Sequence, residues 1–458
     1  MFVVFNPTTG EPILEMPSDD QKSIEVKMRL AKSAQKKWQE TEVSTRIEII
    51  RKWNDLLNGN LVKLAHVLTC EMGKPISQSL SEIKAVSARV DFFANNIEAF
   101  LKPFCVSEAH ESTQEEISYE PLGVIANISA WNYPYFVGAN VFVPALLMGN
   151  AVLYKSSEFA AMTGHHIVKL MHEAGIPEDV FALVNGVGEA GSTLLNQKVD
   201  GVFFTGSHAT GLKIWQQVRD RIIPVQLELG GKDPTYVCED VNVQKAAESL
   251  AEGVFYNAGQ SCCSVERIYV HESIYAPFLE QLVKKTRHFI VGDPADEKTF
   301  IGPLTRKAQL DVLDAQVADA QACGGRILLG GERIPGAGYF FAPTIIADAN
   351  HDMICMREES FGPIVGVQKV ANDEQALMLM NDTEYGLTAA VYCQSSQRAR
   401  HLLSRVNTGS VYWNCCDRVS SRLPWTGRKN SGIGSTSSIE GLRAFGKIKS
   451  WHLRETSN

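Results

Sequence analysis

The chain has 458 residues, a formal net charge of −8 and 45% hydrophobic residues, values typical of an ordinary globular protein. This composition excludes a disordered or collagen-like chain, and the length predicts roughly two to four domains. The acidic balance, with no stripe of Lys and Arg, argues against nucleic acid or an anionic membrane as a partner. The apolar stretches are shorter than the about 18 residues of a membrane-spanning helix, and the first residues lack the basic region of a secretory signal.

The cysteines are too sparse for a disulfide framework. There are ten, none with the CxxC spacing of many metal sites, so a reducing, cytoplasmic location is expected. Two pairs are adjacent, Cys262–Cys263 and Cys415–Cys416. His165 and His166 would point from different faces of a helix, so no metal site is predicted.

The first hundred residues are predicted to be helical. Ile24, Met28, Ala31, Ala34 and Trp38 recur at steps of three or four and form one apolar stripe. A similar pattern continues over residues 45–70.

From residue 117 onward, short apolar runs alternate with stretches of helix length. Strands are predicted at 123–129, 151–155, 180–185, 201–206 and 224–229. Helices are predicted at 136–149, 160–174, 189–196 and 210–220. This alternation predicts a parallel sheet with right-handed crossovers, which is a doubly wound α/β domain that binds ligands at the carboxyl ends of its strands.

A second α/β pattern follows in the C-terminal half. Its strands are predicted at 267–271, 326–329, 364–370, 387–393 and 409–414. Its helices are predicted at 274–290, 306–322, 373–381 and 396–405. The junction near 228–262 would place a site in a cleft between the two halves.

Three residues are candidates for chemistry, each with a structural alternative. Cys262 follows a glycine-containing turn, where backbone N–H groups favour a thiolate, unless it is a buried packing cysteine. Glu228 ends an apolar run, which fits a general base with a raised pKa or a salt-bridged strand end. Asn132 follows the first predicted strand, where its side-chain N–H can stabilise an oxyanion or its role can be that of a turn residue.

Two glycine motifs lie between a predicted strand and a predicted helix. GVGEAG at 186–191 matches the dinucleotide fingerprint, although it follows a third strand rather than the first. GSHATG at 206–211 is the other. Either motif can offer backbone N–H groups to a phosphate at a helix N-terminus, and either can be an ordinary turn.

Five segments, in this order, resemble signatures of the NAD(P)-dependent aldehyde dehydrogenase superfamily. They are WNYP at 131–134, FTGS at 204–207, LELGGK at 227–232, NAGQSCC at 257–263 and EESFGP at 358–363. The resemblance implies that Cys262 attacks the aldehyde carbonyl and that Asn132, with the Cys262 backbone N–H, holds the oxyanion. Hydride transfer would leave a thioester, which Glu228 would hydrolyse through an activated water. Cys263 would be a packing residue.

For the cofactor, the resemblance favours the GSHATG turn over GVGEAG. The residues implied to bind it are Trp131, Lys155, Glu158, Gly206, Ser207, Gly211, Leu229, Glu359 and Phe361. Ser207 and Trp131 would approach the pyrophosphate, and Glu359 and Phe361 the nicotinamide end. Glu158 would accept from both ribose hydroxyls and repel a 2′-phosphate, which favours NAD, although Lys155 tolerates NADP.

The chain departs from the family pattern at two positions. Many members carry a lysine where this chain has Val141, and a glutamate where it has Thr436. These two groups are thought to relay protons in relatives. The departures therefore predict another exit route for the proton taken up by Glu228.

The substrate pocket is expected to be lined by Tyr133, Phe136, Val137, Tyr256 and the loop 415–425. Arg418 and Arg422 on this loop suggest a substrate with a carboxylate, a semialdehyde such as succinate semialdehyde. The alternative is that both arginines point to solvent or brace the loop against Asp417.

The resemblance implies an aldehyde-dehydrogenase-like α/β subunit of three parts. A Rossmann-type cofactor-binding domain would span 1–230, interrupted by a small β arm near 103–121. An α/β catalytic domain would span 231–430, and a C-terminal oligomerisation strand 440–458. The arm implies a homodimer or homotetramer.

Two other enzyme classes stay open. Relatives that pass the acyl group to coenzyme A generally lack the glutamate found here as Glu228, so its presence favours hydrolysis. A non-redox cysteine esterase would need a base beside Cys262, usually a histidine, and no histidine stands out.

Overall fold

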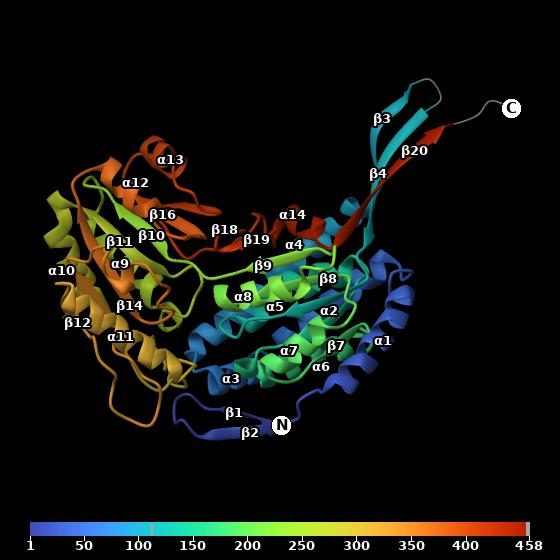
Figure 1. Ribbon diagram of the computed structural model, residues 1–458, viewed down its shortest axis with the longest axis horizontal. Helices are drawn as coiled ribbons and strands as arrows, with labels where there is room; N and C mark the ends of the chain where they lie inside the picture. The colour runs from blue at the N-terminus through green and yellow to red at the C-terminus, as the bar shows by residue number, and fades with distance from the viewer. Residues whose placement is uncertain (111–112, 455–458) are drawn as a thin grey trace.

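The apolar runs of the first half form five strands of a six-stranded sheet, in the order β19-β9-β8-β5-β6-β7 (Figure 1). The computed structural model describes residues 1–110 and 113–454. The strands are β5 (Val124–Ile128), β6 (Ala151–Lys155), β7 (Phe181–Leu183), β8 (Gly201–Thr205), β9 (Val225–Glu228) and β19 (Gly432–Ile433). The first five are parallel, and β19 joins β9 antiparallel. The five strands predicted in this half are therefore confirmed.

Helices cover this sheet on both faces. They are α1 (Gln21–Trp38), α2 (Val43–Gly59), α3 (Leu61–Met72), α4 (Ile76–Leu101), α5 (Pro134–Leu147), α6 (Ala161–Ala174), α7 (Gly188–Leu195), α8 (His208–Val218) and α14 (Ser438–Arg443). The apolar stripe predicted on α1 is buried except at Ala34, which is half-buried. The prediction of helix throughout the first hundred residues is wrong at the start, because Phe2–Phe5 (β1) and Pro12–Met16 (β2) form a hairpin.

The order of the strands locates a ligand site. From β5 the chain continues to β6 and β7 on one side, whereas β8 and β9 lie on the other side. Such a reversal opens a crevice at the carboxyl ends of the two central strands, β5 and β8. Trp131 and Asn132 follow β5, and Gly206 and Ser207 follow β8.

The second half builds a seven-stranded sheet, in the order β12-β13-β14-β11-β10-β16-β17. The strands are β10 (Asp233–Val237), β11 (Val265–His271), β12 (Arg326–Leu329), β13 (Thr344–Ala347), β14 (Ile364–Val370), β16 (Thr388–Tyr392) and β17 (Ser410–Trp413). The helices around it are α9 (Val243–Phe255), α10 (Tyr275–Thr286), α11 (Ala308–Ala322), α12 (Asp373–Asn381) and α13 (Ser396–Leu403). The sequence pattern predicts five of these strands and four of these helices, but not β10, β13 or α9.

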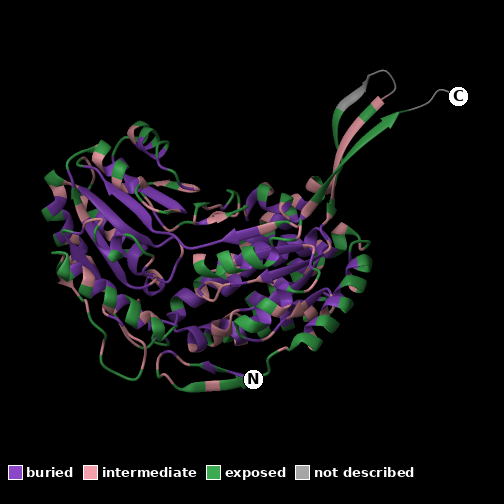
Figure 2. Cartoon of the chain, in the orientation of Figure 1, coloured by how far each residue is buried: buried purple, intermediate pink, exposed green. Residues whose placement is uncertain are grey.

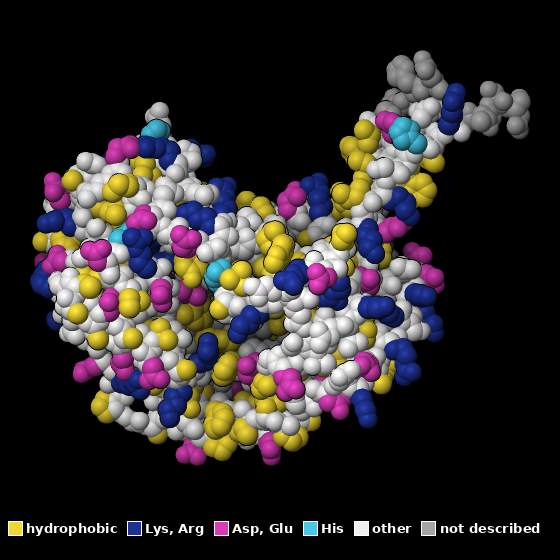
Figure 3. Space-filling model, in the orientation of Figure 1, with side chains coloured by type: hydrophobic (Ala, Val, Ile, Leu, Met, Phe, Trp, Pro, Cys, Tyr) yellow, Lys and Arg dark blue, Asp and Glu magenta, His cyan; other side chains and the backbone are white. Residues whose placement is uncertain are grey.

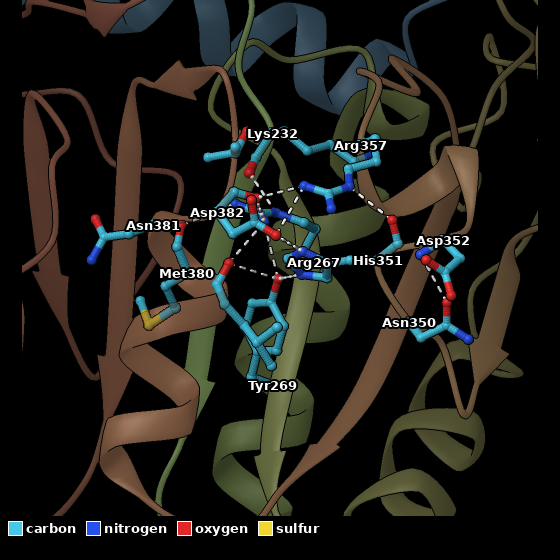
Figure 4. Close-up of polar contacts among 12 residues, drawn as sticks. Lys232, Arg267, Tyr269, Asn350, His351, Asp352, Arg357, Met380, Asn381 and Asp382 are labelled. Carbon is cyan, nitrogen blue, oxygen red and sulfur yellow. Dashed lines mark hydrogen bonds and ion pairs between the residues drawn. The ribbon is translucent and has the colours of Figure 1, made fainter.

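A buried arginine ties the second sheet to the end of α12 (Figure 4). Arg267 on β11 donates from Nε to the carbonyl of Lys232 (2.9 Å) and from Nη2 to that of Met380 (3.2 Å). The last carbonyls of a helix lack partners within the helix, so the guanidinium satisfies them. The Tyr269 hydroxyl lies between Arg267 and His351, 3.0 Å and 2.7 Å away.

Three antiparallel strands project from the body as an arm (Figure 1). They are β3 (Phe104–His110), β4 (Thr113–Pro121) and β20 (Gly446–Arg454). Most of the described arm residues are exposed or half-buried, whereas the inner strands of both large sheets are mostly buried (Figure 2). The C-terminal strand begins at Gly446 rather than near residue 440, because α14 precedes it. Among the described residues, no helix has the length and apolar character needed to cross a bilayer.

Candidate active site

A cavity of about 1120 Å³ is lined by residues from both large sheets and their loops. Figure 3 shows the surface hollowed between the two lobes, with hydrophobic side chains inside the hollow. Its walls include Asn132, Glu228 and Cys262, and also Glu158 and Glu359. Residues far apart in the chain therefore meet at one site, next to the crevice that the strand order creates.

Cys262 follows a turn with an unusual backbone. Asn257, Ala258 and Gly259 all have positive φ angles, of 53°, 54° and 71°. A Cβ on Gly259 would collide with the carbonyl oxygen of Gly362, so the third position requires glycine. Positive φ at alanine costs about 1 to 3 kcal/mol, and such strain is concentrated at functional sites. The turn brings the half-buried Cys262 to the cavity wall.

Asn132 is fixed to the same turn. Its side-chain Nδ2 donates to the carbonyl of Gln260 at 3.1 Å, and its own carbonyl accepts from Lys74 Nζ at 2.7 Å. Asn257 Nδ2 also donates to the Gln260 carbonyl at 3.1 Å. The Asn132 amide has a second N–H group, which can serve an oxyanion beside Cys262.

A buried ion pair supports this arrangement from behind. Lys74 pairs with Glu82, and both side chains are almost completely buried. Glu82 also accepts from the backbone N–H of Tyr135 at 3.0 Å, near the N-terminus of α5. Lys74 Nζ lies 3.8 Å from the centre of the Tyr133 ring. The pair therefore holds Asn132 and the residues that follow it in the chain.

Glu228 lies at the end of β9 and is 9% exposed. The hydroxyl of Thr436 donates to one carboxylate oxygen, and that of Thr205 to the other at 3.3 Å. Burial raises the pKa of Glu228 to about 7, opposed by these hydrogen bonds and by the charge of Arg89. A carboxyl group that changes charge near neutral pH is suited to general-base work.

The predicted phosphate turn, GSHATG, leads into helix α8. Ser207 caps this helix by accepting from the Thr210 N–H at 3.3 Å. Gly206 and Ser207 line the cavity, so the helix N-terminus can receive a phosphate there. Gly211 does not line it. A Cβ at this glycine would lie 2.6 Å from Leu229 Cδ2, so Gly211 allows close packing rather than direct cofactor contact.

Lys155 and Glu158 form another part of the cavity wall. Lys155 is buried, donates to the Ser156 carbonyl at 2.8 Å, and lies 3.5 Å from Glu158. The Glu158 side chain is one-third exposed and can accept from a ligand hydroxyl. This donor and acceptor set suits the ribose diol of a nucleotide.

Glu359 and Phe361 are placed by the second sheet. Glu359 accepts from the Gly231 N–H at 3.0 Å, and burial raises its pKa to about 8. Glu266 fixes the same segment by accepting from the N–H of Phe361 at 3.0 Å. The Phe361 ring meets Trp131 edge to face at 5.5 Å, so the two lobes touch at this part of the cavity.

The remaining wall is aromatic and bears two charged groups. Tyr133, Phe136 and Tyr256 line the cavity, together with Asp417 and the exposed Arg418. Asp417 accepts from the Cys263 thiol at 3.0 Å.

Arg422 lies apart from the predicted pocket. It is exposed and is not among the described residues that line the cavity. Its position on the loop 415–425 was compatible with the pocket, but the loop turns only its earlier residues and Trp425 inward.

The cavity suits a dinucleotide plus a small substrate. Its volume slightly exceeds the roughly 300 to 1,000 Å³ of common small-molecule sites. Glycine backbone and a capped helix N-terminus line the cavity together with Glu158, Glu359 and Cys262. A family model described as the aldehyde dehydrogenase family matches residues 1–451. The chain belongs to the aldehyde dehydrogenase family.

Relatives and solved structures agree over almost the whole chain. The betaine aldehyde dehydrogenase of Brucella anthropi is 33% identical over 457 residues, covering 98% of this chain and 93% of that protein. The NAD(P)+ succinate semialdehyde dehydrogenase Sad of Escherichia coli is 33% identical over 450 residues, covering 98% and 96%. An indole-3-acetaldehyde dehydrogenase complexed with NAD+ superimposes with a TM-score of 0.96 at 30% identity, covering 99% and 93%.

Several residues of this aldehyde dehydrogenase site escape prediction from motifs. Lys74 and Glu82 are such a pair, and the available signal is a glutamate among the apolar positions of a long helical pattern, on a face that also buries Gln78 and Arg89. Gly188 and Gly191 of the GVGEAG segment also line the cavity, beside the favoured GSHATG turn. Thr436, which lacks an ionisable group, contacts Glu228 directly through its hydroxyl.

Away from this site, Cys238, Glu239 and Asp373 place possible metal-binding atoms within 4.8 Å of one another. Arg398 lies among them and pairs with Glu239 at 2.9 Å and Asp373 at 2.6 Å. The Arg398 guanidinium therefore already neutralises the carboxylates of Glu239 and Asp373.

Proposed function

We propose that this enzyme oxidises an aldehyde to the carboxylic acid with NAD(P)+, through a covalent adduct on Cys262. The observation that carries the proposal is that Cys262, Asn132 and Glu228 line the same cavity. The same cavity of about 1120 Å³ is also lined by Glu158 and Glu359, and its volume supplies room for a dinucleotide. We propose NAD as the preferred cofactor, because the Glu158 carboxylate would repel a 2′-phosphate.

The first step is nucleophilic addition. The Cys262 thiolate attacks the carbonyl carbon, and the carbonyl oxygen gains the negative charge of the tetrahedral adduct. The free N–H of Asn132 and the backbone N–H of Cys262 stabilise this oxyanion. The Asn132 donor costs no reorganisation, because Lys74 and Gln260 already hold the residue.

The second step is oxidation of the adduct. Bound NAD(P)+ would supply the hydride acceptor for the carbon attached to sulfur, and this oxidation would leave a thioester on Cys262. Trp131 and Phe361 meet at this part of the cavity, and Glu359 is tied to the Gly231 backbone. These contacts would hold the nicotinamide end and exclude water from the adduct before oxidation.

The third step is hydrolysis. Glu228 takes a proton from a water, the oxygen bonds to the thioester carbon, and the carbon–sulfur bond breaks to release the acid and the thiolate. Because the pKa of Glu228 is raised to about 7, a large fraction of the enzyme molecules carry this carboxyl group in its ionised form at neutral pH. Glu228 supports hydrolysis over transfer of the acyl group to coenzyme A.

A non-redox cysteine esterase has less support. Among the described residues that line the cavity there is no histidine to act as base for Cys262. The groove bounded by Glu158, Ser207 and Glu359 would also have no use in such an enzyme.

The charge of the substrate is a narrower proposal. Of the two arginines on the loop 415–425, Arg418 lines the cavity and Arg422 does not. Recognition of a semialdehyde carboxylate would therefore depend on Arg418. Asp417 on the same wall would disfavour an anion, although it accepts from the Cys263 thiol. Turnover of succinate semialdehyde against butanal measures which charge dominates.

We also propose that the arm joins copies of this chain into a homodimer or homotetramer. Ile448, Trp451 and Leu453 on β20 and Phe104 on β3 expose 40% to 68% of their surface. Exposed apolar strands at a sheet edge are suited to pairing with another chain. Light scattering on the full chain and on Ile448→Glu tests this, since a monomeric wild type would contradict it. A cytoplasmic location stays a prediction.

The test of the function is NADH formation with a panel of aldehydes, using NAD and NADP separately. Acid must accumulate in proportion to NADH. Formation of acid without NADH would indicate an esterase, and a requirement for coenzyme A would indicate acyl transfer.

A further inference from the structure

The turn before Cys262 needs support from outside, because its backbone is strained. Asn257 and Ala258 both have positive φ angles, of 53° and 54°, and neither is glycine. Such a conformation persists only where the surrounding structure holds it in place. Within the turn, the backbone N–H and the side-chain Nε2 of Gln260 both donate to the Asn257 carbonyl, at 3.0 Å and 3.2 Å. The backbone N–H of Asn257 takes its partner from another part of the chain.

That partner is Gln78, in the first turn of α4. Its side-chain Oε1 accepts from the Asn257 N–H at 2.9 Å, although 179 residues separate the two in the chain. Its Nε2 donates to the carbonyl of Phe300 at 2.8 Å. The two bonds use opposite atoms of the amide, so a flipped side chain would satisfy neither partner. Gln78 is 4% exposed, and a buried N–H that lost this acceptor would be costly.

The Phe300 contact reaches the same turn by a second path. The Phe300 ring meets Tyr256 edge to face at 6.2 Å, and Tyr256 directly precedes Asn257 in the chain. Phe300 also stacks on Phe289, with ring centres 4.0 Å apart. Gln78 therefore connects α4 to the turn directly and also through these packed rings.

We propose that Gln78 is a positioning residue for Cys262, because its side-chain amide holds the strained turn in the conformation that places the thiol on the cavity wall. The backbone N–H of Cys262, proposed above as an oxyanion donor, depends on the same turn. Gln78 does not line the cavity in the described structure, so it acts through the turn rather than on the substrate. This inference rests on the proposed function, in which Cys262 attacks the aldehyde.

The first test measures the burst of NADH formation in Gln78→Met, which is close to glutamine in shape and removes both hydrogen bonds. The burst rate is expected to fall about 10- to 100-fold, because a small displacement of a reacting group has effects of this size. The affinity for NAD, measured by fluorescence quenching, is expected to stay near the wild-type level. Gln78→Asn, whose shorter side chain cannot span both partners, gives the same reading if the methionine variant does not fold.

Gln35→Met is the matched control for the loss of a buried glutamine. Gln35 is 8% exposed and donates to the carbonyl of Gly149 at 3.1 Å, and neither residue lines the cavity. The control variant should keep the wild-type burst rate. A purely structural role of Gln78 would give the same pattern as this control, with a lower burst amplitude and an unchanged rate, and that result would overturn the proposal.

The second test relieves the strain in the turn itself. Glycine adopts positive φ without steric cost, so Ala258→Gly removes the strain at one of the two positions. Adding Ala258→Gly to Gln78→Met should return most of the lost burst rate, because the turn then needs less support. A slow burst that glycine does not restore would contradict the role of Gln78 in holding this conformation.

The third test needs neither aldehyde nor NAD. The Cys262 thiolate displaces iodide from iodoacetamide, and mass spectrometry follows the alkylated peptide with time. In Gln78→Met alkylation is expected to slow about tenfold, because the relaxed turn withdraws the thiolate from the cavity and access governs its reaction. An unchanged rate would overturn the proposal. Absence of a burst in the wild type would instead contradict the proposed function, and alkylation would still decide the role of Gln78.

Discussion

The side-chain amide of Asn132 donates to the carbonyl oxygen of Gln260, 3.1 Å away, two residues before Cys262. One hydrogen bond thus joins the loop after β5 to the loop after α9, although 128 residues separate the two partners. This hydrogen bond therefore fixes the proposed oxyanion donor, Asn132, relative to the turn that carries the proposed nucleophile, Cys262. Lys74 adds a second constraint, because its Nζ donates to the Asn132 carbonyl.

Replacing Asn132 with alanine should slow the addition step. Loss of one oxyanion donor typically lowers the rate by about 10² to 10³. We expect the burst of NADH in Asn132→Ala to slow by this factor, while binding of NAD, measured by fluorescence quenching, stays near the wild-type level. A burst at the wild-type rate would show that this amide does not hold the oxyanion.

Replacing Glu228 with glutamine should separate oxidation from hydrolysis. The variant is expected to give a full burst of NADH followed by a steady-state rate reduced about 10² to 10⁴-fold. In the wild type, steady-state turnover should increase as pH rises through about 7, because the base acts in its ionised form. Cys263→Ala is the matched control and should keep the burst and the pH profile.

The same carboxyl group should affect stability in the opposite direction. Burial raises the pKa of Glu228 above its unfolded value, so the folded state favours the protonated form. The resulting stability is fully present below the unfolded pKa of about 4.3 and is lost as pH rises through about 7. Relative to Glu228→Gln, the wild type should therefore lose about 3 kcal/mol across this range. Parallel unfolding curves for the two proteins from pH 5 to pH 8 would argue against the raised pKa.

The buried pair behind Asn132 should be important for both folding and activity. Lys74→Met leaves the Glu82 carboxylate buried without its partner, which typically costs about 3 to 5 kcal/mol. Lys285→Met, in a more exposed pair with Glu252, should cost less than about 1 kcal/mol. Denaturant unfolding measures both values. Equal effects of the two substitutions would contradict the supporting role of Lys74.

The two arginines on the loop 415–425 form a natural comparison. If Arg418 binds a substrate carboxylate, Arg418→Ala should raise the KM for succinate semialdehyde about tenfold and leave that for butanal unchanged, as for loss of a charge-assisted hydrogen bond. Arg422→Ala is the control, because Arg422 does not line the cavity in the described structure. Identical kinetics of the two variants with succinate semialdehyde would remove the carboxylate proposal.

The strands of the first sheet could be predicted because their runs are apolar and buried on both sides. Strand β10 could not be predicted, because it begins with Asp233-Pro234 and its sequence resembles a loop. The structure shows why it is tolerated: Asp233 accepts from both the N–H and the hydroxyl of Thr388, on the neighbouring strand β16. Such a partner 155 residues away leaves no local signal.

The residues of the candidate site likewise include some that the sequence could predict and others that it could not. Motifs located Cys262, Glu228 and Asn132, because their residue types and positions after turns and strands carry the signal. The groups that support them, Lys74, Thr436 and Gln78, come from segments whose local sequence indicates only a helix or a turn. Their roles depend on tertiary contacts, and the exposure of Arg422 likewise depends on how the loop folds.

The central claim is that Cys262 carries the acyl group. Glu228→Gln should trap this intermediate, because hydrolysis is slowed while addition and oxidation continue. Mass spectrometry of the variant after mixing with NAD and an aldehyde should give a mass increase equal to the acyl group, mapped to the peptide that contains Cys262 and lost in the double variant with Cys262→Ala. No adduct on that peptide during NADH formation, or an adduct on Cys263 instead, would contradict the account.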